Sequence, residues 1–340
     1  MKLSRVLRIS RPRFWIYELG PYMIGVLWWF LVALNNTNSE ESQALIWHFW
    51  SIKSSRIAFY TLYPEAFIIL LLLGFYFLIP ANIWIYWIND IYDYETDKLN
   101  PKKLEWYEAL VTPKEQKKLR YRILWTTLPF VIILCMYLLW WMKLANWFQD
   151  RSFTYIALSN IWEAGNIGIL CSFFAFLFFS GQYSAKPIRA KARPILDSFF
   201  SAWHYIATAV FGYLLVNPAW DINRYYVIAG MARAMAMHAF SAVPDIQADK
   251  DAKLATIATL LWWKATIRAC FGLYLLASVL GYSFLWRVSV MLGVVYCWLM
   301  MWAATLYGDE KKVFALYKRF PWINTVSGMI LFFVVLLKIL

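Results

Sequence analysis

About nine apolar stretches, each long enough to cross a bilayer as a helix of roughly 20 residues, constrain this 340-residue chain more than any other feature. They begin near positions 14, 67, 121, 166, 198, 225, 266, 287 and 322. A segment inside a bilayer must satisfy its backbone polar groups internally, so each stretch is expected to be an α-helix. The sequence therefore predicts an all-α integral membrane protein with about nine transmembrane helices.

The composition agrees with this class, because 62% of the residues are hydrophobic and 20% are aromatic, well beyond the usage of soluble domains. No Gly/Ser-rich linker or low-complexity tract divides the chain, so residues 1–340 are expected to form a single domain. The longest predicted excursion from the helices is residues 35–65, whose aromatic side chains suggest a place on the membrane surface.

Basic residues set the expected orientation, since Lys and Arg are retained on the cytoplasmic side during insertion. A topology with the N-terminus inside places most of the 33 basic residues on that side, in segments 1–13, 89–122, 184–197, 244–258 and 309–321. The net charge of +13 is then explained by topology and by contact with anionic membrane lipid. Nucleic acid is not an expected partner.

An acidic cluster follows the second apolar stretch, in NDIYDYETDKLNPKK. If the helix continues through it, Asp90, Asp93 and Asp97 lie on one helix face. Like charges at that spacing repel, so a cation is expected beside them. Oxygen ligands without His or Cys suit Mg²⁺, which keeps some of its waters and binds substrate phosphate.

A second acidic pair, Asp245 and Asp249 in AVPDIQADKDAK, has the spacing of one helix face. Asp251 points away from that pair in a regular helix and is expected to be solvated. Two acidic clusters that face each other across a helix bundle would hold two Mg²⁺ ions, one on each side of a diphosphate.

The loop YSAKPIRAKARP brings basic residues to the same predicted face. Arg189 offers planar hydrogen-bond donors, Lys191 a point charge, and the Tyr183 and Ser184 hydroxyls add neutral donors. Each feature alone has an ordinary explanation, solvation of a helix end for the acids and topology for the loop. Their coincidence on one membrane face favours a shared function, the binding of a diphosphate.

Four segments resemble the UbiA-type intramembrane prenyltransferases. PANIWIYWINDIYDYETDKLNPKK resembles their first Asp-rich motif, NDxxDxxxD, and DIQAD is similar to their second, DxxxD. YSAKPIRAKARP is similar to a third conserved loop, and SRPRFW to the entry into the first helix. The resemblance implies a helical bundle around a central cavity, with a cytoplasmic cap over the active site.

The resemblance also implies an activity, the Mg²⁺-dependent transfer of an isoprenyl group from an allylic diphosphate to a lipophilic acceptor through a carbocation. By motif position it assigns metal and diphosphate ligation to Asn89, Asp90, Asp93, Asp97, Asp245 and Asp249, and contacts with the diphosphate to Tyr183, Ser184, Arg189 and Lys191. The motif wording is most similar to the carotenoid branch of the family, the lycopene elongases, so a carotenoid such as lycopene is the expected acceptor.

Two alternatives remain open at this point. An aromatic acceptor of the quinone-precursor type, or another lipid, would need a polar group to orient it. A membrane cation transporter could also carry Asp clusters at a pore mouth, although the apolar stretches offer few acidic residues for an onward path. Polar residues inside apolar stretches tend to face a cavity or a partner, which makes cavity candidates of Asn82, Arg233 and His238.

Overall fold

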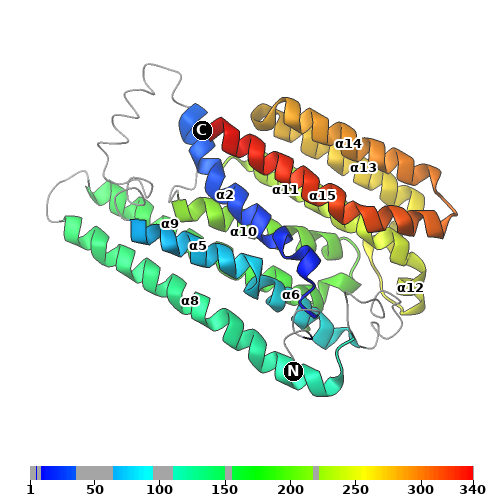
Figure 1. Ribbon diagram of the computed structural model, residues 1–340, viewed down its shortest axis with the longest axis horizontal. Helices are drawn as coiled ribbons and strands as arrows, with labels where there is room; N and C mark the ends of the chain where they lie inside the picture. The colour runs from blue at the N-terminus through cyan, green and yellow to red at the C-terminus, as the bar shows by residue number, and fades with distance from the viewer. Residues whose placement is uncertain are drawn as a thin grey trace.

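The computed structural model describes Arg5 and residues 9–35, 64–94, 110–149, 155–216 and 222–339. Every regular element in these ranges is helical (Figure 1). The long helices are α2 (Ile16–Asn35), α5 (Pro64–Leu78), α6 (Pro80–Tyr92), α8 (Pro113–Gln149), α9 (Tyr155–Ser184), α10 (Leu196–Val216), α11 (Arg224–Ala242), α13 (Ile257–Leu285), α14 (Arg287–Thr305) and α15 (Glu310–Ile339). Shorter helical turns are η1 (Pro12–Phe14), η4 (Ala190–Ala192), η5 (Val243–Asp245) and α12 (Ile246–Asp251).

Two large apolar cores hold the bundle together, and a smaller one lies around Trp87 between α6 and α8. The first large core is formed between α2, α5, α8, α9 and α10 and contains aromatic rings around Tyr76, Phe77 and Phe173 in tilted and edge-to-face contacts. The second large core lies between α11, α13, α14 and α15. Figure 1 shows α8 and α5 on one side and α13 and α14 on the other, with α2, α10 and α11 between them. Because α10 packs against both α2 and α11, it joins the two halves.

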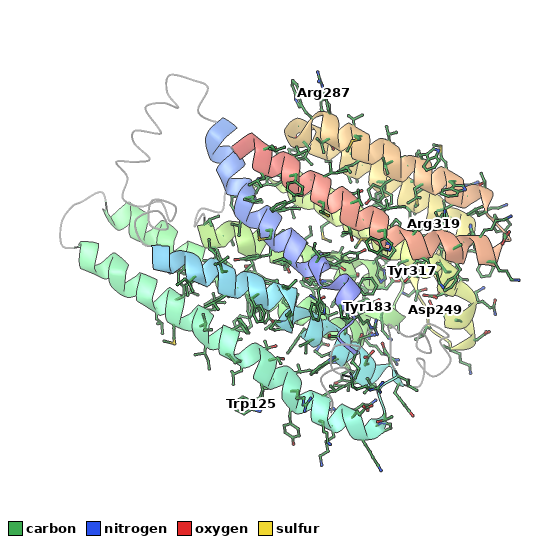
Figure 2. The ribbon with its side chains drawn as sticks, in the orientation of Figure 1. Trp125, Tyr183, Asp249, Arg287, Tyr317 and Arg319 are labelled. Atoms are coloured by element: carbon green, nitrogen blue, oxygen red, sulfur yellow. The ribbon has the colours of Figure 1, made fainter. Side chains whose placement is uncertain are left out.

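The outer surface is apolar, as a lipid-facing surface must be. Large side chains such as Leu71, Val279 and Trp125 are exposed, and Trp125 points outward from α8 (Figure 2). Among the described residues, seven helices are long and apolar enough to cross a membrane, one of them formed by α5 and α6 together. The all-helical integral membrane fold is therefore confirmed. The number nine stays a prediction, as does the cytoplasmic side of the N-terminus.

Helix breaks differ from the sequence-based expectation at both acidic segments. Helix α6 ends at Tyr92, and Asp93 is its C-cap residue, with φ −108° and ψ 6°. The assumption that this helix continues through the acidic segment is therefore wrong. Asp97 lies outside the described residues. Helix α11 ends at Ala242 and a 3₁₀ turn that contains Pro244 follows, because proline cannot donate the next intrahelical hydrogen bond. Most of the segment 35–65 also lies outside the described residues.

A close crossing of α2 and α10 should be sensitive to added volume. A Cβ atom on Gly25 would overlap the carbonyl oxygen of Ala209, and one on Gly212 would overlap that of Tyr22. Because backbone atoms cannot rotate away, we expect Gly25→Ala to lower the free energy of unfolding by about 1–3 kcal/mol. Gly272 has no atom within 4 Å of such a Cβ, so Gly272→Ala is the control and should be neutral or slightly stabilising. Equal unfolding midpoints for the two variants in detergent would contradict this close packing.

Candidate active site

The two acidic segments and the basic loop come together at one end of the bundle. Tyr183, at the end of α9, and Asp249, in α12, are neighbours in Figure 2. The charges of four carboxylates act on the Tyr183 hydroxyl, first that of Asp197 and then those of Asp93, Asp249 and Asp245. Residues more than 150 positions apart in the sequence thus surround one phenol.

A hydrogen bond links the first acidic segment directly to the end of α9. The Ser184 hydroxyl donates to Oδ1 of Asn89, at 2.7 Å. Ser184 is fully buried, because α9 stops there and the chain turns into the loop that contains Pro187. Two residues that the sequence assigned to separate motifs are therefore direct partners.

Protein cations already neutralise the first acidic segment. Arg11 Nη2 lies 2.8 Å from Oδ1 of the buried Asp90, and its guanidinium stacks over the Tyr86 ring at 4.8 Å. Asp93 is buried as well and forms an ion pair with Lys191. Both cations come from distant parts of the chain. Lys191 was among the predicted site residues, whereas Arg11 was not.

Arg189 stands apart from these pairs. It has a left-handed backbone, with φ 46°, at the start of the turn η4. Its Nε is buried without a hydrogen-bond partner in the part of the chain that the structure describes. A guanidinium in this position has donors left for a ligand.

The second acidic segment is held by the start of α13. The hydroxyl of Thr256, which is the N-cap of α13, donates to Oδ2 of Asp249 at 3.3 Å. The Leu254 amide donates to the backbone oxygen of the same residue at 2.7 Å. Asp251, in contrast, is exposed and accepts a hydrogen bond from Gln247 at 2.9 Å, as expected of a solvated carboxylate.

The donor atoms at this end of the bundle fit a hard divalent cation. They are carboxylate and amide oxygens from α6, η5 and α12, and no Cys belongs to the group. In the described ranges no three acidic, His or Cys side chains lie close enough together to form a cage for a metal. Mg²⁺ does not need such a cage, because it binds through one or two carboxylates, its own waters and substrate phosphates.

A large apolar cavity begins beside this cluster. Its volume is about 620 Å³, and it lies between α2, α10, α11, α13, α14 and α15. Met237 of α11 lines the cavity, and the next residue, His238, lies 2.8 Å from the Tyr183 hydroxyl through its Nε2, so one end of the cavity is next to the polar cluster. Of the three cavity candidates, Arg233 lines it, whereas Asn82 and His238 are not among its lining residues.

Asn82 instead donates hydrogen bonds to carbonyl groups at the break between α5 and α6, next to Pro80. Its amide group donates to the carbonyl oxygens of Phe77 and Leu78, at 3.0 and 3.1 Å. A further bond reaches the carbonyl of Trp15, at 3.2 Å. Carbonyl groups that lose their intrahelical partners must be satisfied inside a membrane, which explains the amide at this position.

Arg233 places a polar spot on the cavity wall. Its Nη2 donates to the Tyr296 hydroxyl at 2.9 Å, and the guanidinium lies 4.6 Å above the same ring. The Tyr296 hydroxyl in turn donates to Oδ1 of Asn324 at 2.7 Å. Because guanidinium carries only donors, this spot is suited to an oxygen atom that accepts hydrogen bonds.

A buried contact between an acidic residue of α2 and a histidine of α10 was not predicted. His204 Nδ1 lies 2.9 Å from Oε1 of Glu18, and the Thr208 hydroxyl is 3.3 Å from Oε2 of the same carboxylate. An acidic residue in an apolar stretch signals a partner. The sequence could not say which one, because residue 204 is 186 positions away.

The fold is that of the UbiA prenyltransferases. The chain superposes on the solved structure of a UbiA homolog from Archaeoglobus fulgidus bound to DMAPP and Mg²⁺ with a TM-score of 0.55 and 15% identity, covering 97% of this chain and 99% of that one. No family model matches the sequence. The chain therefore shares the fold of the UbiA-type intramembrane prenyltransferases, as the resemblance of its motifs predicted.

Sequence relatives point to one branch of that class. The chain is 29% identical to a lycopene elongase/hydratase of Haloarcula japonica over 96% of this chain and 90% of that protein. It is 27% identical to the lycopene elongase/hydratase of Halobacterium salinarum, over 95% and 93% of the two chains, and 27% identical to that of Corynebacterium glutamicum, over 97% and 96%. The similarity to the carotenoid branch is therefore confirmed along nearly the whole chain.

The buried contact between Glu18 and His204 should stabilise the fold only when both residues are present. We expect His204→Leu to lower the free energy of unfolding by about 1–3 kcal/mol, because it leaves Oε1 of the buried Glu18 without the imidazole beside it. The double variant Glu18→Met/His204→Leu should recover most of that loss, since apolar side chains of similar size then fill the site. Chemical unfolding in detergent measures both. Additive losses in the double variant would show that the two residues do not act on each other.

Proposed function

We propose that this prenyltransferase uses Mg²⁺ and an allylic isoprenyl diphosphate to extend a carotenoid acceptor such as lycopene. The observation that carries the proposal is the juxtaposition of an oxygen-rich, cation-paired cluster around Tyr183 with a 620 Å³ apolar cavity. The names of the sequence relatives, lycopene elongase/hydratases, support a carotenoid. The fold neighbour with DMAPP and Mg²⁺ supports the donor and the metal.

The donor is assigned to the polar cluster. Mg²⁺ would neutralise the departing diphosphate there, with two ions as the proposed number. Arg189, whose Nε has no described protein partner, and Lys191 would donate to diphosphate oxygens, together with the Tyr183 and Ser184 hydroxyls. The metal and diphosphate ligands proposed on α6, the segment after it, η5 and α12 are Asn89, Asp90, Asp93, Asp97, Asp245 and Asp249.

The acceptor is assigned to the cavity. When the allylic C–O bond breaks, its electron pair leaves with the diphosphate, and the terminal alkene of the acceptor then gives its π electrons to form the new C–C bond. This leaves a carbocation on the acceptor, which is discharged when an adjacent C–H bond gives its proton to the released diphosphate and its electron pair forms a new alkene. An alkene is a weak nucleophile, so the carbocation must be kept from water, and the aromatic side chains of the wall provide apolar faces that also stabilise a cation. Tyr17 and Tyr205 are two of these side chains.

Orientation in the membrane follows from the positive charges. The donor cluster and the N-terminal segment share one end of the bundle through the Arg11–Asp90 pair. The basic residues of the loop 184–197 lie at the same end. We place this end on the cytoplasmic side, with residues 1–340 acting as a single domain in contact with membrane lipid and without nucleic acid.

One observation favours a second candidate acceptor. The guanidinium of Arg233 on the cavity wall has no function toward a pure hydrocarbon. It would suit the carboxylate or hydroxyl of an aromatic acceptor of the quinone-precursor type. The two candidates share the donor site and differ only in what the cavity holds.

Metal dependence tests the donor site. We expect diphosphate release from dimethylallyl diphosphate to require Mg²⁺ and to stop in excess chelator. Asp249→Asn should lower turnover by about 100-fold or more, because even outer partners of a metal site cost 10- to 100-fold. Asp251→Asn is the matched control on the same helix, and its exposed carboxylate should make the change mild. Full activity in chelator, or equal losses in both variants, would refute the assignment.

A competition between acceptors tests the cavity. Purified protein in lipid receives dimethylallyl diphosphate, Mg²⁺ and either lycopene or a hydroxybenzoate, and the products are identified by mass spectrometry. We expect lycopene to be prenylated and Arg233→Met to change its rate by less than about threefold, since no hydrogen bond to a hydrocarbon is lost. Prenylation of the aromatic acid with lycopene untouched would select the second candidate. Arg233→Met should then cost about 10- to 100-fold, as for a lost hydrogen bond to a charged group.

A further inference from the structure

His238 lies between two hydroxyl groups from two other helices. Its Nε2 is 2.8 Å from the Tyr183 hydroxyl at the end of α9. Its Nδ1 is 3.1 Å from the Ser198 hydroxyl in the first turn of α10. The Tyr183 and His238 rings meet edge to face, with centroids 5.7 Å apart. Both ring nitrogens of His238, which does not line the cavity, therefore lie within hydrogen-bond distance of hydroxyl groups. One of these hydroxyls belongs to Tyr183, a residue of the donor cluster.

The hydrogen-bond pattern fixes the direction of the protons. Ser198 is completely buried, and within the described residues its hydroxyl has one partner, the His238 ring. A buried hydroxyl must donate its proton, so Nδ1 accepts from Ser198. In a neutral imidazole the proton is then on Nε2, and Nε2–H donates to the oxygen of Tyr183.

The consequence concerns the proton of Tyr183 itself. Because its oxygen accepts from His238, the phenolic O–H cannot donate to that ring and is turned elsewhere. The carboxylates whose charges act on the hydroxyl are those of Asp197, Asp93, Asp249 and Asp245, in this order, and the last three were assigned above to the donor site. A hydroxyl whose proton already points into this space donates to an anionic oxygen without losing another bond.

We propose that His238, with its tautomer set by Ser198, is a positioning residue that holds the Tyr183 hydroxyl as a hydrogen-bond donor to the diphosphate of the donor substrate. The inference rests on the proposed function, because it needs a diphosphate in the cluster. It assigns roles to His238 and Ser198 that involve no contact with the substrate. It also accounts for a polar chain of three residues across α9, α10 and α11.

Binding of inorganic diphosphate with Mg²⁺ to the full-length protein in lipid, followed by calorimetry, tests the proposal without prenyl transfer. Tyr183→Phe should weaken binding about 10- to 100-fold, the range for a hydrogen bond to a charged group. Ser198→Ala should weaken it about 3- to 10-fold, because Nδ1 is no longer forced to accept. In the double variant, Ser198→Ala should add nothing to Tyr183→Phe. Ser198→Thr, which keeps the hydroxyl, should bind as the wild type does.

Ser241 provides the matched control. Its hydroxyl donates to the backbone oxygen of His238 at 2.7 Å and leaves the ring alone, so Ser241→Ala should not change diphosphate affinity. Unchanged binding in Ser198→Ala, or a loss that adds fully to that of Tyr183→Phe, would overturn the positioning role. A wild-type protein that binds no diphosphate would overturn the proposed function as well, and the two failures are therefore distinguishable.

Discussion

Neutralisation of buried carboxylates is the constraint on which the rest of this structure depends. Asp90 and Asp93 are nearly inaccessible at the end of an apolar bundle, where an unpaired charge would cost several kcal/mol. Arg11 and Lys191 pair with them and so fasten the N-terminal segment and the loop after α9 to α6. The polar end of the bundle is thus closed by ion pairs, and its shape follows from them.

These pairs also bear on how the site would accept its donor. A divalent cation and a diphosphate would bring their own charges to carboxylates that already hold protein cations. The lysine and arginine would then have a second anion to bind, the diphosphate, without leaving the site. Arg189 differs, because its buried Nε has no partner among the described residues. The cluster therefore contains two cations that pair with carboxylates, Arg11 and Lys191, and a third, Arg189, that has a donor left for a ligand. Under the proposed function, this combination would suit the reversible binding of a highly charged substrate.

The contrast between the two parts of the site has a chemical reason. Ionisation of an allylic diphosphate needs strong electrostatic stabilisation, whereas the carbocation that it leaves needs an apolar, dry surrounding. Under the proposed function these two needs would be met in two places, the polar cluster around Tyr183 and the apolar cavity, whose lining includes Tyr205. Arg233 is a charged residue on a mainly apolar cavity wall, and it is hydrogen-bonded to Tyr296. Under the proposed function, these few polar atoms would decide between a hydrocarbon acceptor and a polar one.

The sequence by itself determined the class of fold and predicted where the site lies. Apolar stretches of about 20 residues are long enough to cross a bilayer as helices. Charged residues at the ends of those stretches predicted that the two acidic segments and the loop from Tyr183 to Lys191 share one face. Only the tertiary structure decided the partners. Arg11 pairs with Asp90 across 79 positions of sequence, and His204 lies against Glu18 across 186. Pairing of this kind depends on how helices are arranged in space, and neither periodicity nor hydropathy within one helix contains that information.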